Sequence, residues 1–139
     1  MSLKITAITE QLAVAPQIAA ADIADIAAKG YRTLVNNRPD NEAPGQLPSE
    51  EARRLAEKAG LRYEYFPITA PTLTSDQVDE FSRLLAGLEG PVLAYCRSGS
   101  RCSLLWAATE LRKSRTSPDT LIRKLAERGF DISSLTRFA

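Results

Sequence analysis

The sequence predicts an α/β fold in which a mainly parallel sheet is flanked by helices. Short apolar stretches alternate along the chain with segments whose apolar residues recur at helical spacing, which is typical of a parallel sheet covered on both faces. The 139 residues are 44% hydrophobic and 25% charged, the balance of an ordinary globular domain. We therefore expect residues 1–139 to form a single domain with a buried core.

The first elements are two short strands and a helix. Ile5–Ile8 and Leu12–Ala15 have the apolar character of strands, and Pro16 ends the second one. From Gln17 onwards apolar residues recur at helical spacing, and Gly30 occupies the position that glycine prefers after a helix C-terminus.

A strand, a helix and a second strand are expected next. Tyr31–Asn36 is apolar enough to be a buried strand, and the polar, proline-rich segment 37–45 follows it as a loop. Ser49 is predicted to cap a helix that ends at Gly60. Leu61–Phe66 is then predicted as a strand.

The next helix and strand lead to a cysteine. Thr74 and Gln77 have the spacing of a capping box, which predicts the start of a helix there. This helix ends before Pro91–Tyr95, the most apolar of the predicted strands. Cys96 follows that strand directly.

Two helices are predicted in the last third of the chain. The segment from Leu104 to Leu111 is strongly apolar and is expected to be a central helix. Ser117 opens another helix that ends at Gly129, and the tail from Asp131 is expected to form one or two helical turns.

Composition excludes several classes of function. The net charge is +1 with no block of like charges, so we expect neither a nucleic-acid nor a membrane partner. The chain has no histidine, which excludes Ser-His-Asp and Cys-His catalysis, and two cysteines cannot form a four-cysteine zinc site. We expect no metal and no cofactor. With no secretory signal or membrane span recognisable, a cytoplasmic protein with reduced thiols is expected.

One segment, CRSGSR at 96–101, carries residues suited to catalysis. Cys96 leaves the carboxyl end of a buried strand, where open α/β sheets bind ligands, and a helix follows at once. Backbone N–H groups, the helix N-terminus and the Arg101 guanidinium would bind an anion and lower the pKa of the Cys96 thiol. The predicted anion-binding loop comprises Arg97, Ser98, Gly99, Ser100 and Arg101.

A cysteine in this position can also be a small apolar side chain in a tight turn. Here a glycine follows Cys96 at the third position and arginines follow at the first and fifth positions. These neighbours favour a nucleophilic Cys96 over a purely structural one.

The spacing of Cys96 and Arg101 resembles the active loop of rhodanese-like sulfurtransferases, which often begins with Cys-Arg. Tyrosine and dual-specificity phosphatases have one more residue between the cysteine and the arginine. The order of the predicted elements, the Val35–Asp40 strand and loop and the Pro91–Cys96 strand are similar to another family. It is the phosphatase-like domain of the bacterial beta-lactamase hydrolase-like proteins. This resemblance extends from Ile5 to Leu135 and implies a phosphotyrosine protein phosphatase-like fold.

The resemblance leaves two chemistries open, because members of that family are described both as phosphatases and as sulfur transferases. The shorter loop favours sulfur transfer, in which Cys96 takes a sulfur atom from thiosulfate or a persulfide and holds it as a persulfide. A phosphatase acting on a phosphoester needs a general acid, and the segment 67–73 has no carboxylate. Asp40 is the remaining candidate acid, and its alternative role is that of a turn residue beside Pro39. We therefore rank rhodanese-like sulfur transfer first and phosphoester hydrolysis second.

A third hypothesis is an anion-binding or redox-sensing module without turnover. In it Cys102 would pair with Cys96 as a resolving cysteine, and the alternative for Cys102 is a buried side chain on the first helical turn. Arg38 is a candidate for the rim of the pocket or for a surface salt bridge. The resemblance also suggests a persulfide dioxygenase of the metallo-β-lactamase type as a partner.

Overall fold

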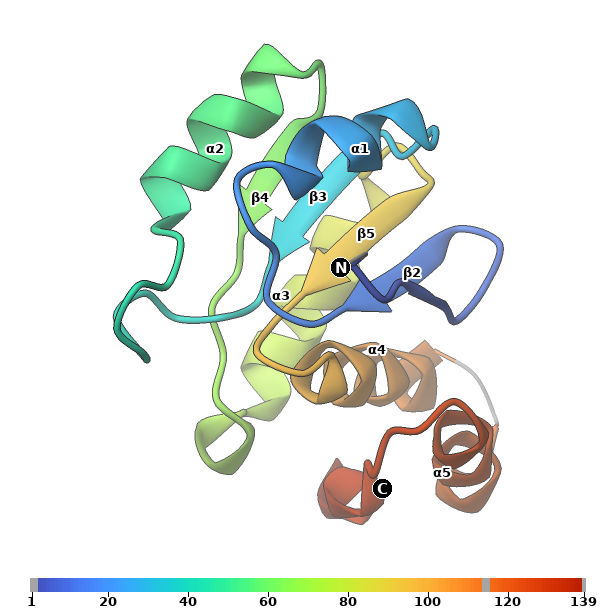
Figure 1. The fold of residues 1–139 in the computed structure, drawn as a ribbon. Helices are drawn as coiled ribbons and strands as arrows, with labels where there is room; N and C mark the ends of the chain where they lie inside the picture. Colours follow the sequence, from blue (N-terminus) through green and yellow to red (C-terminus); the bar gives the residue numbers. More distant parts are fainter. Residues whose placement is uncertain (1–2, 114–115, 139) are drawn as a thin grey trace.

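The protein folds around a single five-stranded sheet with the strand order β1-β2-β5-β3-β4. The computed structural model describes residues 3–113 and 116–138 (Figure 1). The first strand pairs with its neighbour in antiparallel fashion, and all other pairs are parallel. The predicted α/β class with a mainly parallel sheet is therefore confirmed. The strands are β1 (Thr6–Ala7), β2 (Leu12–Ala15), β3 (Thr33–Asn36), β4 (Arg62–Tyr65) and β5 (Val92–Tyr95).

Helices cover both faces of the sheet (Figure 1). They are α1 (Asp22–Ala28), α2 (Ser49–Lys58), α3 (Ser75–Ala86), α4 (Ser100–Lys113) and α5 (Pro118–Glu127), with 3₁₀ helices η1 (Ala70–Thr72) and η2 (Ser133–Phe138). Side chains alternate along each strand, so Leu93 and Tyr95 face α1 and α2 whereas Val92 and Ala94 face α3 and α4. Both faces of the sheet are therefore buried.

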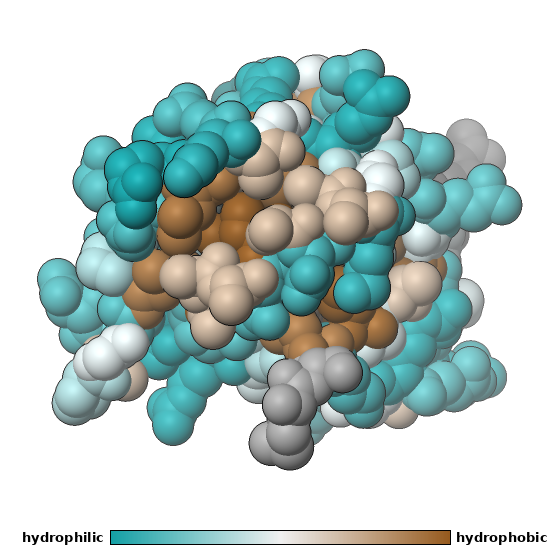
Figure 2. Space-filling model, turned by 45° about the horizontal axis from the view of Figure 1, so that its top comes forward, coloured by the Kyte–Doolittle hydropathy of each residue, from teal (hydrophilic) through white to brown (hydrophobic). Residues whose placement is uncertain are grey.

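The α1–α2 side has an apolar surface among hydrophilic side chains (Figure 2). Helix α1 buries Ile23 and Ile26 against the sheet, while Ala24 and Ala28 are exposed. A hollow here is lined by Ile23 and Ala24 of α1, by Leu55 and Lys58 of α2, and by Ala20 and Ala59 next to these helices. The small side chains of α1 thus leave part of this apolar layer open to solvent.

The parallel pairing brings several chain segments to one edge of the sheet. Strand β5 lies between β2 and β3, and Tyr95 is in register with Ala15 on one side and with Asn36 on the other. The residues that follow these three strands therefore leave the sheet together at its carboxyl edge. Cys96 is one of them.

Two helices begin differently from the sequence-based expectation. Helix α1 begins at Asp22 rather than at Gln17, and the Asp22 carboxylate accepts a hydrogen bond from the Ala19 N–H (2.7 Å). Ser49 was expected to be a cap but is the first helical residue of α2, because Pro48 holds the cap position. The hydroxyl of Ser49 contacts the Tyr63 hydroxyl instead (2.8 Å).

Two other helix starts agree with the expectation. Thr74 and Gln77 form a complete capping box at α3, with side-chain bonds in both directions. The Ser117 hydroxyl accepts a hydrogen bond from the Thr120 N–H at the start of α5 (3.2 Å). In both cases the capping group lies in the same short segment as its partner, so local sequence was sufficient to predict it.

A buried polar network supports the loop that leaves β3. The Asn36 amide donates a hydrogen bond to the Tyr63 hydroxyl (3.1 Å), and its oxygen accepts one from the Arg38 N–H (2.8 Å). Asn36 is 1% exposed, so its amide nitrogen and oxygen bond to protein groups and not to water. The network fixes the direction in which the chain continues from β3 toward the edge of the sheet.

Replacing Asn36 should test this role. In Asn36→Ala the Arg38 N–H and the Tyr63 hydroxyl lose a buried partner, and we expect the free energy of unfolding to fall by about 2 kcal/mol. Urea denaturation measures the change, with Glu57→Ala on the exposed side of α2 as the control. Equal stability of Asn36→Ala and the wild type would contradict the role given to the network.

Candidate active site

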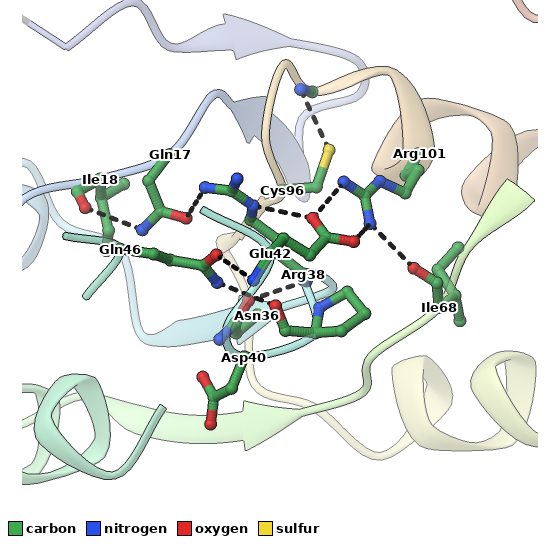
Figure 3. A network of polar contacts seen from close by, with 12 residues as sticks. Gln17, Ile18, Asn36, Arg38, Asp40, Glu42, Gln46, Ile68, Cys96 and Arg101 are labelled. Atoms are coloured by element: carbon green, nitrogen blue, oxygen red, sulfur yellow. Dashed lines mark hydrogen bonds and ion pairs between the residues drawn. The ribbon is translucent and has the colours of Figure 1, made fainter. Parts of the chain in front are cut away.

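Cys96 lies at the floor of the loop that joins β5 to α4. It is completely buried, and the Gly99 N–H donates a hydrogen bond to its sulfur (3.1 Å) (Figure 3). Gly99 has a φ of 94°, a conformation that side chains rarely adopt, and this turn directs the N–H toward the sulfur. Helix α4 begins at the next residue, so its positive N-terminus is close to the site.

This environment favours the thiolate form of Cys96. Its pKa is lowered to about 6, chiefly by a hydrogen bond from the Cys102 side chain. Burial opposes this effect, and N–H groups of the loop and of the first helical turn add to it. The sequence analysis expected loop N–H groups, the helix N-terminus and Arg101 to lower this pKa; the leading favourable contribution is instead the Cys102 side chain, followed by N–H groups. Cys96 is therefore largely a thiolate at neutral pH.

Cys102 has the opposite character. It is buried on the first turn of α4, and burial raises the pKa of its thiol well above the ordinary value. Both cysteines are free thiols in this structure. At neutral pH Cys102 is thus a neutral donor beside the Cys96 thiolate, and its assignment as a resolving cysteine stays a prediction.

The Arg101 guanidinium is already bound by a carboxylate that the sequence analysis had not singled out. Its two terminal nitrogens donate to the two oxygens of Glu42, at 2.8 and 2.7 Å (Figure 3). One of these nitrogens also donates to the Ile68 carbonyl (3.1 Å). The hydrogen bonds from Arg101 are the main reason why the pKa of Glu42 is lowered to about 2.

Arg38 holds the other side of the same carboxylate. Its Nε donates to Glu42 (2.9 Å), and another nitrogen donates to the Gln17 side chain (3.0 Å). Arg38 is 4% exposed, so it is neither a surface salt bridge nor an open rim residue. The sequence did contain a signal for Glu42, since this carboxylate follows Arg38 in the loop predicted at the carboxyl edge of the sheet.

The structure places Asp40 in a different role from the one expected. Its carboxylate accepts a hydrogen bond from the Ser49 N–H at the start of α2 (2.9 Å). Its own N–H donates to the Tyr65 hydroxyl (2.9 Å). The side chain points away from Cys96 in Figure 3. The assignment of Asp40 as a general acid therefore finds no support in this geometry, because its carboxylate serves α2.

The remaining loop residues differ in exposure. Arg97 and Ser98 are exposed, and the Arg97 carbonyl accepts a hydrogen bond from the Gln17 N–H (3.2 Å). The Ser98 hydroxyl accepts one from the Ser100 N–H (3.3 Å). The buried Ser103 hydroxyl donates to the Gly99 carbonyl (2.9 Å) and so braces the loop from within α4.

The segment 67–73 forms a wall next to Arg101. It contains no carboxylate, and its backbone is held by two arginines. Arg101 donates to the Ile68 carbonyl, and Arg137 of η2 donates to the Pro71 and Leu73 carbonyls (3.5 and 2.8 Å). The residues that the structure describes include no group of three or more side chains arranged to hold a metal ion. Within the same residues, no helix has both the length and the apolar character to cross a bilayer.

Fold and site together define a phosphatase-like α/β domain. A crystal structure from Neisseria meningitidis, described as a candidate phosphatase, is 34% identical with a TM-score of 0.86. The alignment covers 96% of this chain and 95% of that one. A kinase-associated phosphatase, crystallised with its catalytic cysteine replaced by serine, is 16% identical with a TM-score of 0.74. That alignment covers 91% of this chain and 82% of that one, and at this identity it shows the fold alone.

The chain belongs to the beta-lactamase hydrolase-like protein family. Residues 4–112 match the family's phosphatase-like domain. A beta-lactamase hydrolase-like protein from Agrobacterium fabrum is 32% identical over 136 residues, which are 98% of this chain and 32% of that protein. The chain spans about a third of the length of the curated relatives it matches. The resemblance inferred from the sequence is confirmed, and these comparisons favour the phosphatase alternative over the sulfur transfer that was ranked first.

Replacing Gly99 should disturb the site more than its positive φ alone requires. A Cβ at this position would lie 2.9 Å from the Phe130 ring, so in Gly99→Ala the ring or the loop must shift in addition to the strain of the positive φ. We expect Gly99→Ala to be destabilised by about 2 kcal/mol and to raise the pKa of Cys96 as the N–H leaves the sulfur. Gly60→Ala is the matched control, because Gly60 also has a positive φ but open space around it. Similar effects of the two variants on the thiol pKa would refute this account of Gly99.

The lowered pKa of Cys96 can be measured directly. The ultraviolet absorbance of the thiolate should rise with pH through a midpoint near 6, and this step should be absent in Cys96→Ser. Because a neutral donor at position 102 stabilises the thiolate, Cys102→Ala should move the midpoint upward. Cys102→Ser, which keeps a donor, should move it less. A midpoint at the ordinary thiol value in the wild type would overturn the assignment.

Proposed function

We propose that the protein is a cysteine-dependent phosphatase that hydrolyses phosphoesters through Cys96. The observation that carries the proposal is the position of Cys96, which lies between a central parallel strand and a helix N-terminus, with the Gly99 N–H on its sulfur, in a domain of phosphatase-like fold. A thiolate there is both a nucleophile and a group surrounded by donors suited to oxyanions.

In the proposed reaction the Cys96 sulfur attacks phosphorus while the ester oxygen leaves with the electron pair of the P–O bond. Loop N–H groups and Arg101 would bind the phosphoryl oxygens, where negative charge is concentrated. The leaving oxygen takes a proton from an acid or from water. Water then attacks phosphorus, the P–S bond breaks with its electron pair on sulfur, and inorganic phosphate and the thiolate are the products.

Sulfur transfer remains a second candidate because it needs no proton donor from the carboxylates around the site. Glu42 has a pKa near 2 and Asp40 is bound at the start of α2, so neither is a ready proton donor in this state. Transfer from thiosulfate needs no proton donor. The Cys96 thiolate attacks the outer sulfur, a new S–S bond forms, and sulfite leaves with the electron pair of the S–S bond of thiosulfate. The product is a Cys96 persulfide that an acceptor thiol can discharge.

One set of measurements separates the two chemistries. We expect the wild type to release nitrophenol from p-nitrophenyl phosphate, with inhibition by vanadate and a loss of at least about a thousandfold in Cys96→Ser. Cys102→Ser should keep most of the activity, because it keeps a donor to the thiolate.

Intact-protein mass spectrometry after incubation with thiosulfate or glutathione persulfide tests the alternative. A Cys96-dependent adduct of one sulfur atom without phosphatase turnover would replace hydrolysis by sulfur transfer. If the protein shows neither activity, an anion-binding or redox module is the better description.

A further inference from the structure

The oxyanion-binding end of Arg101 is occupied by a side chain of the protein itself. We propose that Glu42 is a built-in competitor that determines which anions the site accepts, so that oxyanions enter by exchanging with Glu42 on Arg101. The proposal rests on the Cys96 site of the proposed function, but it concerns anion binding and does not depend on turnover.

The ion pair is bidentate. Both terminal nitrogens of Arg101 donate to the two oxygens of Glu42, which is the bidentate arrangement that a guanidinium offers to phosphate and other oxyanions. The Cys96 charge also acts on Arg101, so the two groups belong to one electrostatic site. An oxyanion cannot use these same N–H groups while the carboxylate occupies them.

The side chain of Glu42 can exchange without unfolding its loop. Its backbone N–H donates to the Gln46 side chain (3.1 Å), whose amide in turn donates to the Pro39 carbonyl (2.9 Å). This brace fixes the backbone independently of Arg101. Arg38 also keeps its own bond to one oxygen of Glu42, so the carboxylate leaving Arg101 retains a cation. Exchange therefore needs a side-chain rotation only.

The ion pair is more exposed to solvent than the sulfur is. Cys96 is completely buried, whereas the side chains of Arg101 and Glu42 are 18% and 26% exposed. The ion pair is thus the part of the cluster in contact with solvent. An incoming anion meets it before it meets the thiolate.

Charge balance determines which substrates this arrangement disfavours. Two guanidinium groups, one carboxylate and one thiolate sum to zero, so the occupied site has no net attraction for a dianion. Phosphoesters and thiosulfate that use this pair of Arg101 N–H groups must displace Glu42. Glu42 therefore weakens the binding of oxyanions at this end of Arg101.

Phosphate binding to Cys96→Ser protein tests the exchange. We expect the added change Glu42→Gln to tighten binding of inorganic phosphate, measured by calorimetry, by about five- to tenfold. Glutamine keeps an oxygen for Arg38 but is a weaker ligand for Arg101. Glu51→Gln, which removes a carboxylate from the exposed pair with Arg54 on α2, is the matched control and should change binding by less than about twofold.

Unchanged or weaker phosphate binding by Glu42→Gln would overturn the proposal, because Glu42 would then only orient Arg101. A second measurement does not depend on that variant folding. In a crystal structure of Cys96→Ser soaked in phosphate, the ion should lie on Arg101 with Glu42 on Arg38 alone. Glu42 still bound to both nitrogens of Arg101 would refute the exchange. Neither measurement needs phosphatase activity, so failure of the proposed function leaves this test intact.

Discussion

The parallel pairing of β5 between β2 and β3 is the constraint on which the site depends. Because the strands run in the same direction and in register, the residues after Ala15, Asn36 and Tyr95 leave the sheet at one edge. Gln17, Arg38 and Cys96 come together for that reason, although they are far apart in the sequence. With a different strand order, Gln17 and Arg38 would not reach the loop that holds Cys96.

The thiolate and the cationic groups have separate supports. Cys96 is stabilised mainly by short-range hydrogen bonds from Cys102 and from loop N–H groups, which act over a few ångströms in a buried setting. Arg101 and Arg38 direct their charge toward Glu42. The leading contributions to the thiolate therefore differ from the contacts that hold the two arginines, while the Cys96 charge and Arg101 also act on each other.

Much of the fold could be predicted from the sequence because its signals are local. The alternation of apolar strands and amphipathic helices, the capping box at Thr74 and the loop at Cys96 all lie within short segments. The errors arose where a side chain bonds to a partner that lies outside its own short segment of sequence. Asp40 supplies the acceptor at the start of α2 that was assigned to Ser49, and it cannot be recognised from the residues around the helix. Glu42 was missed for the same reason, since its partner Arg101 lies 59 positions along the chain.

The way in which the segment 67–73 is held has a consequence for how such a site can diversify. Arg101 and Arg137 hold this segment by donating hydrogen bonds to the carbonyl groups of Ile68, Pro71 and Leu73. Carbonyls are present whatever side chain is attached, so the hydrogen bonds from the two arginines do not depend on which exposed side chains the segment carries. New side chains can be introduced on this wall without loosening its attachment. The exposed side chains of segment 67–73 can thus change next to Arg101, and a change in the chemistry of the site need not begin with a loss of structure.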